Sequence, residues 1–518
     1  MERIFSADGR GAVRARAKSS STAAAQAAST PAAQLLHEAV TGLRTRHREY
    51  SAADGLWPWQ RRMLSAALLI LGCGLLLATD ATLVALLALM AVPFFCVVAL
   101  RCVALWPPSG FRSSPKPTVI AGRLPVYTVM VPLFREAAVI PGLLNSLREL
   151  DYPADRLQVM LIVEAVDAET QEALRRVRLD RHMQIVVVPD GAPRTKPRAI
   201  QFALQLARGE YVVVYDAEDA PDPGQLRRAL AALRGDKSLG CLQAHLNIYN
   251  SNASWFTRQF MIEYTVLFDC ILPALERLRL PVPLGGTSNH FPRAVLDAVG
   301  GWDPYNVTED ADLGIRLARR GWRVGVLDST TWEEAPPTFR IWKGQRTRWL
   351  KGWMQTYLVH MRRPRRLWRE LGPWRFIGFQ VLMAGMILSS LVHPWFYVFL
   401  AADALRGELL TIPENVLGQW LLGVGLVNLV AGYVSAIALG TVAAVRRGRP
   451  KLAANALMMP AYWLLISLAA YRALWQLVTA PFHWEKTEHA GQAAAHADFH
   501  LPARAAAASS GEKAQRLA

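Results

Sequence analysis

The sequence has few of the residues that build a disulfide-stabilised or zinc-binding fold. Its 518 residues include 5 cysteines, and none of these form a CxxC pair. Cys73, Cys96 and Cys102 lie in or beside apolar runs, where cysteine usually behaves as a small hydrophobic residue. We therefore expect no disulfide framework, which fits a reducing compartment for the soluble part. The sequence also has no zinc-site spacing, no aromatic pattern typical of RNA-binding domains and no internal repeat.

Acidic residues are also few compared with basic ones. Lys and Arg number 58 against 41 Asp and Glu, giving a formal net charge of +17. Such an excess can indicate nucleic-acid binding. Here, however, arginines flank long apolar runs, as in the cytoplasmic loops of membrane proteins. We therefore expect membrane lipid, and no nucleic acid, as a partner.

Residues 1–56 have no apolar signal-peptide core after their early charges. They are rich in Ala, Ser and Arg and show little apolar periodicity. This composition predicts a disordered cytoplasmic tail, or one loose helix around residues 35–43.

Apolar runs occupy two parts of the chain, residues 57–108 and 374–445. The first part holds runs at 63–78 and 81–100, and the second holds runs at 376–401 and 416–445. A membrane-spanning helix needs about 20 apolar residues, and these runs approach or exceed that length. The placement of arginines around them predicts a multi-pass protein of a bacterial-type inner membrane. Both termini and the domain between the two parts are expected in the cytoplasm.

A further apolar run at 457–480 is ambiguous. It is long enough to span, but Arg472 and Gln476 interrupt it and Pro460 breaks its start. Within residues 446–490 we favour a helix at the cytoplasmic interface, with a further span as the alternative. Residues 491–518 are polar and Ala-rich, and are predicted to be a disordered tail.

Residues 125–373 have the composition of a globular domain. Buried strands are predicted at 127–133, 159–163, 184–188 and 211–215, and helices at 136–150 and 199–208. Strands that alternate with helices predict a mainly parallel α/β sheet. Ligands of such sheets bind beyond the carboxyl ends of the strands, and acidic residues follow two of these ends.

Asp216, Glu218 and Asp219 directly follow the fourth predicted strand. Clustered carboxylates can hold Mg²⁺ or Mn²⁺, which prefer oxygen ligands and bridge to a diphosphate. A solvated acidic turn is the alternative, because residues 221–223 (Pro-Asp-Pro) have a turn composition.

Two short pieces carry the strongest signal, residues 308–310 (Thr-Glu-Asp) and 345–349 (Gln-Arg-Thr-Arg-Trp). The first opens a segment with helical spacing, where a carboxylate is stabilised as an anion and can serve as a general base. In the second, arginine beside tryptophan offers a planar cation for phosphate and a flat face for a sugar. Taken singly, either piece also fits a capped surface helix or a cytoplasmic membrane anchor.

Together, in this order, the two pieces resemble the TED and QxxRW motifs of processive family-2 glycosyltransferases such as cellulose, curdlan and hyaluronan synthases. The resemblance covers about residues 125–489. It implies a GT-A fold, meaning a Rossmann-like α/β cytoplasmic domain inserted between transmembrane helices. It also implies inverting, metal-dependent transfer from a UDP- or GDP-sugar to a growing β-linked polysaccharide, coupled to translocation. Four spans are fewer than cellulose synthase has, so we expect self-association or a periplasmic or membrane partner subunit.

The resemblance also implies roles for individual residues. Asp310, within the motif that includes Thr308 and Glu309, is the expected general base. A Mg²⁺ or Mn²⁺ ion is expected on Asp216, with either Glu218 or Asp219 as its second ligand. The implied donor contacts are Glu164, Asp167, Lys196, Asp216, Gln345 and Arg348, and the implied acceptor contacts are Trp349, Gly286, Thr287, Ser288 and Asn289. Trp484, Lys486 and Thr487 occupy the place of a mobile loop that closes over the nucleotide in cellulose synthase, although its FxVTxKG pattern is not present.

Two other functions stay open. The same fold can add a single sugar to a lipid carrier or glycolipid, and the small number of spans favours this alternative. A non-catalytic membrane scaffold is a more distant alternative, supported by glutamate at 164 and 218 where the family has aspartate. The intact Asp216, Asp310 and Arg348 argue against it.

Overall fold

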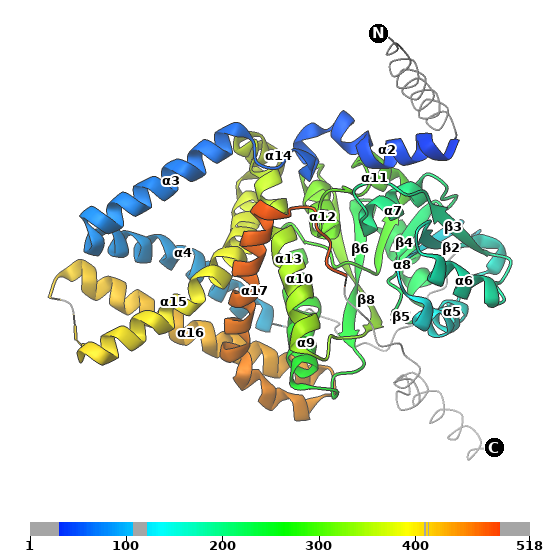
Figure 1. Cartoon of the computed structure of the whole chain (residues 1–518). Helices are drawn as coiled ribbons and strands as arrows, with labels where there is room; N and C mark the ends of the chain where they lie inside the picture. The colour runs from blue at the N-terminus through cyan, green and yellow to red at the C-terminus, as the bar shows by residue number, and fades with distance from the viewer. Residues whose placement is uncertain (1–30, 107–121, 409–410, 413, 487–518) are drawn as a thin grey trace, which may run out of the picture.

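The computed structural model describes residues 31–106, 122–408, 411–412 and 414–486. Thr487 lies outside these residues, as do the tail predicted at 491–518 and residues 1–30 of the N-terminal tail. An α/β domain lies beside a set of long apolar helices that extend away from it (Figure 1).

The domain is built on an eight-stranded sheet with the order β3-β2-β1-β4-β7-β6-β8-β5. The strands are β1 Tyr127–Leu133, β2 Leu157–Glu164, β3 Met183–Val188, β4 Tyr211–Val214, β5 Ala220–Pro221, β6 Leu239–Ile248, β7 Asn289–Pro292 and β8 Arg323–Glu333. Strands β1 to β4 are parallel, as are β6 and β8. β7 runs antiparallel between β4 and β6. The four predicted strands and the mainly parallel sheet are confirmed.

Both faces of the sheet are covered, as is usual for parallel strands. In β1, the buried Val129 and Val131 face one hydrophobic core and Met130 faces the other. The domain helices are α5 Ile140–Arg148, α6 Ala168–Arg176, α7 Lys196–Leu204, α8 Gln225–Gly235, α9 Trp255–Val266, α10 Leu272–Arg277, α11 Arg293–Ala298, α12 Glu309–Arg319 and α13 Phe339–His360. The predicted helices at 136–150 and 199–208 correspond to α5 and α7.

The apolar runs form long helices. They are α3 Pro58–Leu77, α4 Thr79–Leu105, α15 Gly385–Arg406, α16 Val416–Arg446 and α17 Met459–Thr479, and the Arg-rich α14 Pro364–Phe379 leads into α15. Within the described residues, five helical stretches are long and apolar enough to cross a membrane, namely 58–77, 79–105, 364–406, 416–446 and 450–479. In Figure 1, α3, α4, α15 and α16 extend away from the domain, whereas α17 lies along α13 and runs across the direction of α16.

Residues 31–56 are ordered, so the prediction of a disordered tail is wrong there and the helical alternative fits. Helix α2, Pro31–Arg46, packs on α7 and buries Ala39 and Leu43. Tyr50, which follows the helix, is only 1% exposed. The helix lacks a strong apolar stripe because its buried face is made of a few small or widely spaced residues, so the sequence pattern gave little sign of it.

Candidate active site

A cavity of about 320 Å³ lies beyond the carboxyl ends of the parallel strands. Its lining comes from the ends of β1, β2 and β4, the first turns of α7 and α12, helix α13 and the segment after α17. The structure brings most of the predicted site residues together in this lining: Glu164, Lys196, Asp216, Glu218, Gly286, Thr287, Thr308, Glu309, Asp310, Gln345, Arg348, Trp349, Trp484 and Lys486.

Four predicted site residues, Asp167, Asp219, Ser288 and Asn289, are not among the lining residues. Asp167 caps the N-terminus of α6, and Ser288 Oγ donates to Thr331 Oγ1 at 2.6 Å. Asn289 Nδ2 donates to a backbone carbonyl at 2.6 Å. Apart from Asp219, whose contacts are described below, these side chains are used in holding the cavity walls.

Gly286 is one of the residues that line the cavity. The ammonium of Lys196 pairs with Asp216 and donates to the Gly286 carbonyl at 2.8 Å. A Cβ atom at position 286 would lie 3.5 Å from Asp310 Oδ2, 3.7 Å from Lys196 Nζ and 3.9 Å from Asp216 Oδ2. Glycine therefore leaves open a space that two carboxylates and an ammonium surround.

Two acidic side chains in the first turn of α12, Glu309 and Asp310, have raised pKa values. Burial raises the pKa of Asp310 to about 6. Burial and the neighbouring Asp310 raise the pKa of Glu309 to about 7. Burial acts to lower the pKa of Lys196, but the carboxylates of Asp216 and Glu309 outweigh it, so its pKa lies above the usual value and the group is an ammonium. A carboxyl group with a pKa near neutrality is suited to exchanging a proton.

A second group of carboxylates, which includes Asp219 and Glu333, lies near Asp216 and Glu218. Asp219 Oδ2 accepts from the Asp216 backbone N–H at 2.7 Å and from Thr287, and its Oδ1 is buried without a partner in the described part of the chain. Burial, with the charges of Asp216 and Glu218, raises the pKa of Asp219. Burial, with the charges of Asp219, Glu218 and Asp216, also raises the pKa of Glu333. Glu333 ends β8 and was not predicted from the sequence. This accumulation of negative charge favours a bound cation.

The possible metal ligands are limited. Among the described residues, no group of three or more His, Cys, Asp or Glu side chains could hold a metal by itself. Asp216 and Glu218 both line the cavity, whereas Asp219 does not line it and uses its Oδ2 in hydrogen bonds to the Asp216 N–H and Thr287. Two carboxylates fit a divalent cation whose remaining ligands are the oxygens of a diphosphate and water.

Trp349 forms an aromatic wall of the cavity. Its ring stacks on Tyr264, with centroids 6.0 Å apart and planes 23° from parallel. The guanidinium carbon of Arg346 lies 4.5 Å from the rings of both Trp349 and Phe260. Arg346 also pairs with Glu263 at 2.6 Å, so the position of Trp349 is fixed from behind. Sequence reasoning missed Glu263 and Tyr264, because they lie on α9 and no local pattern marks them.

Residues 480–486 lie over the cavity after α17. The guanidinium carbon of Arg348 lies 5.2 Å from the centre of the Trp484 ring. Lys486 pairs with Glu136, just after β1, at 3.0 Å. The segment thus spans from α13 to the start of the β1–α5 connection.

Two side chains of α13 hold this segment through its backbone. Lys351 donates to the carbonyl of His483 at 2.7 Å, and Gln355 Nε2 donates to that of Pro481 at 2.7 Å. Gln355 Oε1 also accepts from the Val307 N–H, at 3.2 Å, immediately before the Thr308–Asp310 turn. One helix therefore connects the acidic turn with the segment that covers the cavity.

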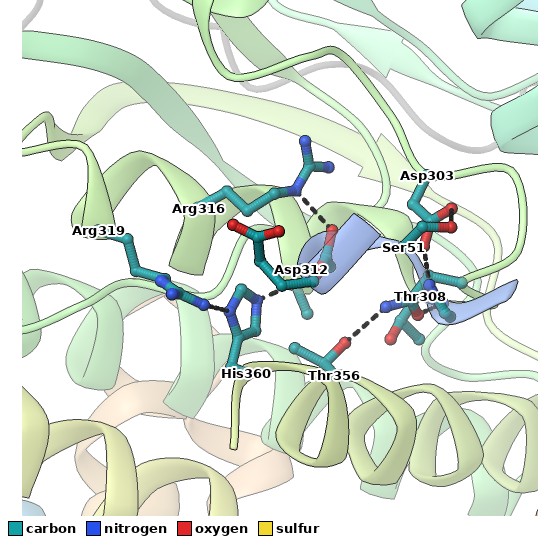
Figure 2. Close-up of polar contacts among 12 residues, drawn as sticks. Ser51, Asp303, Thr308, Asp312, Arg316, Arg319, Thr356 and His360 are labelled. Atoms are coloured by element: carbon teal, nitrogen blue, oxygen red, sulfur yellow. Dashed lines mark hydrogen bonds and ion pairs between the residues drawn. The ribbon is translucent and has the colours of Figure 1, made fainter. Parts of the chain in front are cut away.

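Helix α12 is fixed from behind by a buried polar network (Figure 2). Asp312 accepts from Arg316 at 2.7 Å and lies 3.0 Å from His360 Nε2, and the other ring nitrogen of His360 lies 2.9 Å from Arg319. Burial lowers the pKa of His360 to about 4, so the ring is neutral and donates from Nε2 to the carboxylate. The network attaches the acidic turn to the end of α13.

The ordered N-terminal segment supports the same region. Asp303 accepts from the Ala52 N–H at 2.6 Å and from Ser51 Oγ at 3.1 Å, as Figure 2 shows for Ser51 and Asp303. Arg362, directly after α13, donates to the carbonyls of Ser51 and Gly55 at 2.6 Å each. Residues 50–55 thereby link the turn before α12 to the end of α13.

Part of the chain is similar to known proteins. Residues 125–352 match the family model described as "Glycosyltransferase like family 2". A beta-monoglucosyldiacylglycerol synthase of Synechocystis sp. (strain ATCC 27184 / PCC 6803 / Kazusa) is 33% identical over 247 residues, 46% of this chain and 50% of that protein. Glucomannan 4-beta-mannosyltransferase 2 of Arabidopsis thaliana is 26% identical over 241 residues, 45% of each chain. The chain spans about half the length of these relatives.

A solved structure, the mannosyltransferase PcManGT from Pyrobaculum calidifontis in complex with GDP-Man and Mn²⁺, is also similar. It covers 76% of this chain and 99% of its own, with 21% identity and a TM-score of 0.48.

Proposed function

We propose that residues 125–352, which match the family model "Glycosyltransferase like family 2", form a GT-A glycosyltransferase domain, and that the chain extends a β-linked polysaccharide from a nucleotide-sugar donor. The reaction is an inverting transfer on the cytoplasmic face of a bacterial-type inner membrane. The observation that carries this proposal is the convergence of Asp310, Lys196 and Asp216 on the open space beside Gly286. A base, a cation and a potential metal ligand are the three groups that such a transfer needs at one point.

In this mechanism, Asp310 is the general base. Its carboxylate takes the proton from an acceptor hydroxyl while that oxygen attacks the anomeric carbon of the donor. The bond from the anomeric carbon to the diphosphate oxygen breaks in the same step, so a single displacement inverts the anomeric centre. The pKa of about 6 supports this role, because the group is ionised at neutral pH yet more basic than an ordinary aspartate.

The leaving nucleoside diphosphate is stabilised by cations of the chain. Lys196 and Arg348 both line the cavity, and Arg348 Nε is buried without a hydrogen-bond partner in the described residues. Buried donors of this kind act strongly on charge that develops in the transition state. Asp216 and Glu218 would hold a Mg²⁺ or Mn²⁺ ion, which when bound supplies further positive charge against the diphosphate.

Two further polar atoms support a polar ligand in the cavity. Gln345 Oε1 and Trp484 Nε1 are buried with no partner among the described residues. Unpaired buried polar atoms are costly unless a ligand or water satisfies them. We infer that the donor occupies the part of the cavity beneath residues 480–486, which cover it. We also propose that α17 lies at the membrane interface.

The acceptor end of the cavity faces the apolar helices. Trp349 offers a flat face for a sugar ring, and Met386, Ile387 and Ile466 from α15 and α17 extend the lining towards the candidate spans. This apolar end also fits a lipid-linked acceptor. Transfer of one sugar to a glycolipid is therefore the second candidate function, and it has support from the name of the Synechocystis relative.

The test is transfer by the purified full chain with labelled UDP-glucose, UDP-N-acetylglucosamine and GDP-mannose. A ladder of long products from one donor supports polysaccharide extension. A single lipid-soluble product would replace it with the glycolipid reaction. No product from any donor, together with unchanged polymer output in cells carrying Asp310→Asn, would overturn both and favour the scaffold.

A further inference from the structure

A second hollow lies away from the active-site cavity, at the beginning of α14. It is an open groove of about 850 Å³. Its lining residues are Trp59, Arg362, Arg363, Pro364, Arg365, Arg366, Arg369 and Glu370. Arginines therefore dominate the groove, and Glu370 is its one acidic lining residue.

Two of the five arginines are used by the chain itself. Arg362 donates to backbone carbonyls of residues 51 and 55. Arg366 pairs with Glu49 at 2.7 Å and with Glu370 at 2.6 Å. The acidic side chain in the groove is thus already neutralised by the chain.

The other three, Arg363, Arg365 and Arg369, are exposed and have no ion pair with any described residue. The guanidinium carbon of Arg363 lies 5.6 Å from the centre of the Trp57 ring, a contact that leaves its N–H groups free for an anion. Three unpaired guanidinium groups around one hollow form a site for an anion with several oxygens, because arginine binds phosphate through two parallel hydrogen bonds.

The groove lies where two candidate spans leave the domain. Helix α3 begins at Pro58, and most of its side chains from Met63 onward are apolar and exposed. Gly372 has a φ of 72°, so α14 bends there before continuing into α15. In Figure 1, α14 lies beside the start of α3. Trp59 and Trp368 are exposed at this level, as tryptophans are at a membrane–water interface.

We propose that this groove binds the phosphate headgroup of an anionic phospholipid in the cytoplasmic leaflet. Charge and depth together favour this ligand over a soluble phosphate, because the arginines lie beside the points at which apolar helices enter the bilayer. The tryptophans at the rim contact the acyl–headgroup boundary. The site is independent of the donor cavity and requires only that the chain is embedded through α3 and α15.

The experiment uses the full chain purified in a neutral detergent and titrated with phosphatidylglycerol or phosphatidylcholine. Retained lipid is counted by native mass spectrometry, and Tm is followed in parallel. The groove variant is Arg365→Ala/Arg369→Ala. The matched control is Arg61→Ala/Arg62→Ala, which removes the same charge from exposed positions at the start of α3 that do not line the groove.

We expect wild type and control to retain phosphatidylglycerol and gain Tm from it, and the groove variant to bind it at least tenfold more weakly. Arg365→Lys/Arg369→Lys keeps the charge without the paired hydrogen bonds, and its affinity is expected between the two. Equal losses in the groove and control variants would overturn the proposal, since they would show general surface attraction. It would also be overturned if inorganic phosphate raised Tm as much as the lipid does, or if phosphatidylcholine bound equally well.

Discussion

The ring of Trp484 lies over the guanidinium of Arg348, with 5.2 Å between the ring centre and the guanidinium carbon. This contact joins α13, which carries the predicted donor-binding arginine, to residues 480–486, which cover the cavity. The arginine is buried, and burial lowers its pKa from the usual value. The aromatic face therefore partly replaces water around Arg348, the cation that is proposed to stabilise the leaving diphosphate.

Trp484→Ala is expected to weaken donor binding by roughly tenfold and to lower turnover, because a desolvated cation–π contact contributes up to about 2 kcal/mol and holds the arginine in place. Donor affinity is measured by calorimetry and turnover with labelled donor. Trp475→Ala is the matched control, since this tryptophan on α17 is 71% exposed. Unchanged affinity and turnover in Trp484→Ala would remove the covering segment from the mechanism.

Asp310→Asn is expected to lower kcat by roughly 10² to 10⁴-fold, the usual contribution of a positioned general base. Donor affinity should stay within a few-fold, because the amide keeps the shape of the side chain. Asp297→Asn is the control, because this carboxylate is half exposed and, among the described residues, its ion pair is with Arg293 on α11. A variant at 310 with near wild-type turnover would assign the base elsewhere.

Activity is expected to depend on pH through Asp310. Burial raises its pKa to about 6, and only the ionised carboxylate can accept a proton. As the pH falls through about 6, protonation removes the base, and kcat/KM should then fall about tenfold per pH unit. Glu309, with a pKa of about 7, titrates with it as a pair, so the acid limb is broad. An acid limb near pH 4, the value for an ordinary carboxyl group, would contradict this picture.

A chelator is expected to abolish transfer, and Mg²⁺ or Mn²⁺ to restore it. Glu218→Gln should raise the metal concentration for half-maximal activity by roughly 10- to 100-fold, because changes at a metal site commonly reduce affinity by that factor. Glu172→Gln, on the exposed surface of α6, should leave the metal requirement unchanged. If full activity persisted in the chelator, the reaction would not need a divalent cation.

Tyr50→Ala is expected to lower the Tm of the purified chain. The side chain is 1% exposed and its ring lies 4.6 Å from the guanidinium carbon of Arg319. Truncating a buried aromatic residue costs about 3–5 kcal/mol, which corresponds to roughly 6–20 °C for a domain of this size. Arg46→Ala, at the exposed end of α2, removes only a surface ion pair and should change Tm little.

The sequence was sufficient for strands β1 to β4, and most of the site residues predicted from it lie in the cavity lining. Strands β1 to β4 are short apolar runs, and the motifs at 308–310 and 345–349 mark positions that the fold brings together. Strands β6 and β8 were not predicted, because their buried faces contain polar side chains. Gln243 in β6, for example, is buried and donates to the carbonyl of Thr287 at 3.0 Å. Polar side chains such as this one interrupt the apolar alternation that predicts a strand. Their hydrogen-bond partners are present only in the folded domain.

The residues that hold the two motifs in place could not be predicted for a related reason. Asp303 is held by backbone and side-chain groups near residue 52, and Trp349 by residues of α9. These contacts join segments far apart in the chain, and no local sequence pattern predicts them. The same holds for Glu333, whose place in the cavity depends on the register of β8 beside β6.

The attachment of residues 480–486 to α13 runs largely through main-chain carbonyl groups, those of Pro481 and His483 among them. Every amino acid presents such a carbonyl, so substitutions along this stretch can accumulate without undoing its docking. The docking instead requires the two side-chain donors on α13, Lys351 and Gln355. A homologue with an unrecognisable covering stretch is therefore better identified by a lysine and a glutamine four residues apart, following the Gln-Arg-Thr-Arg-Trp sequence.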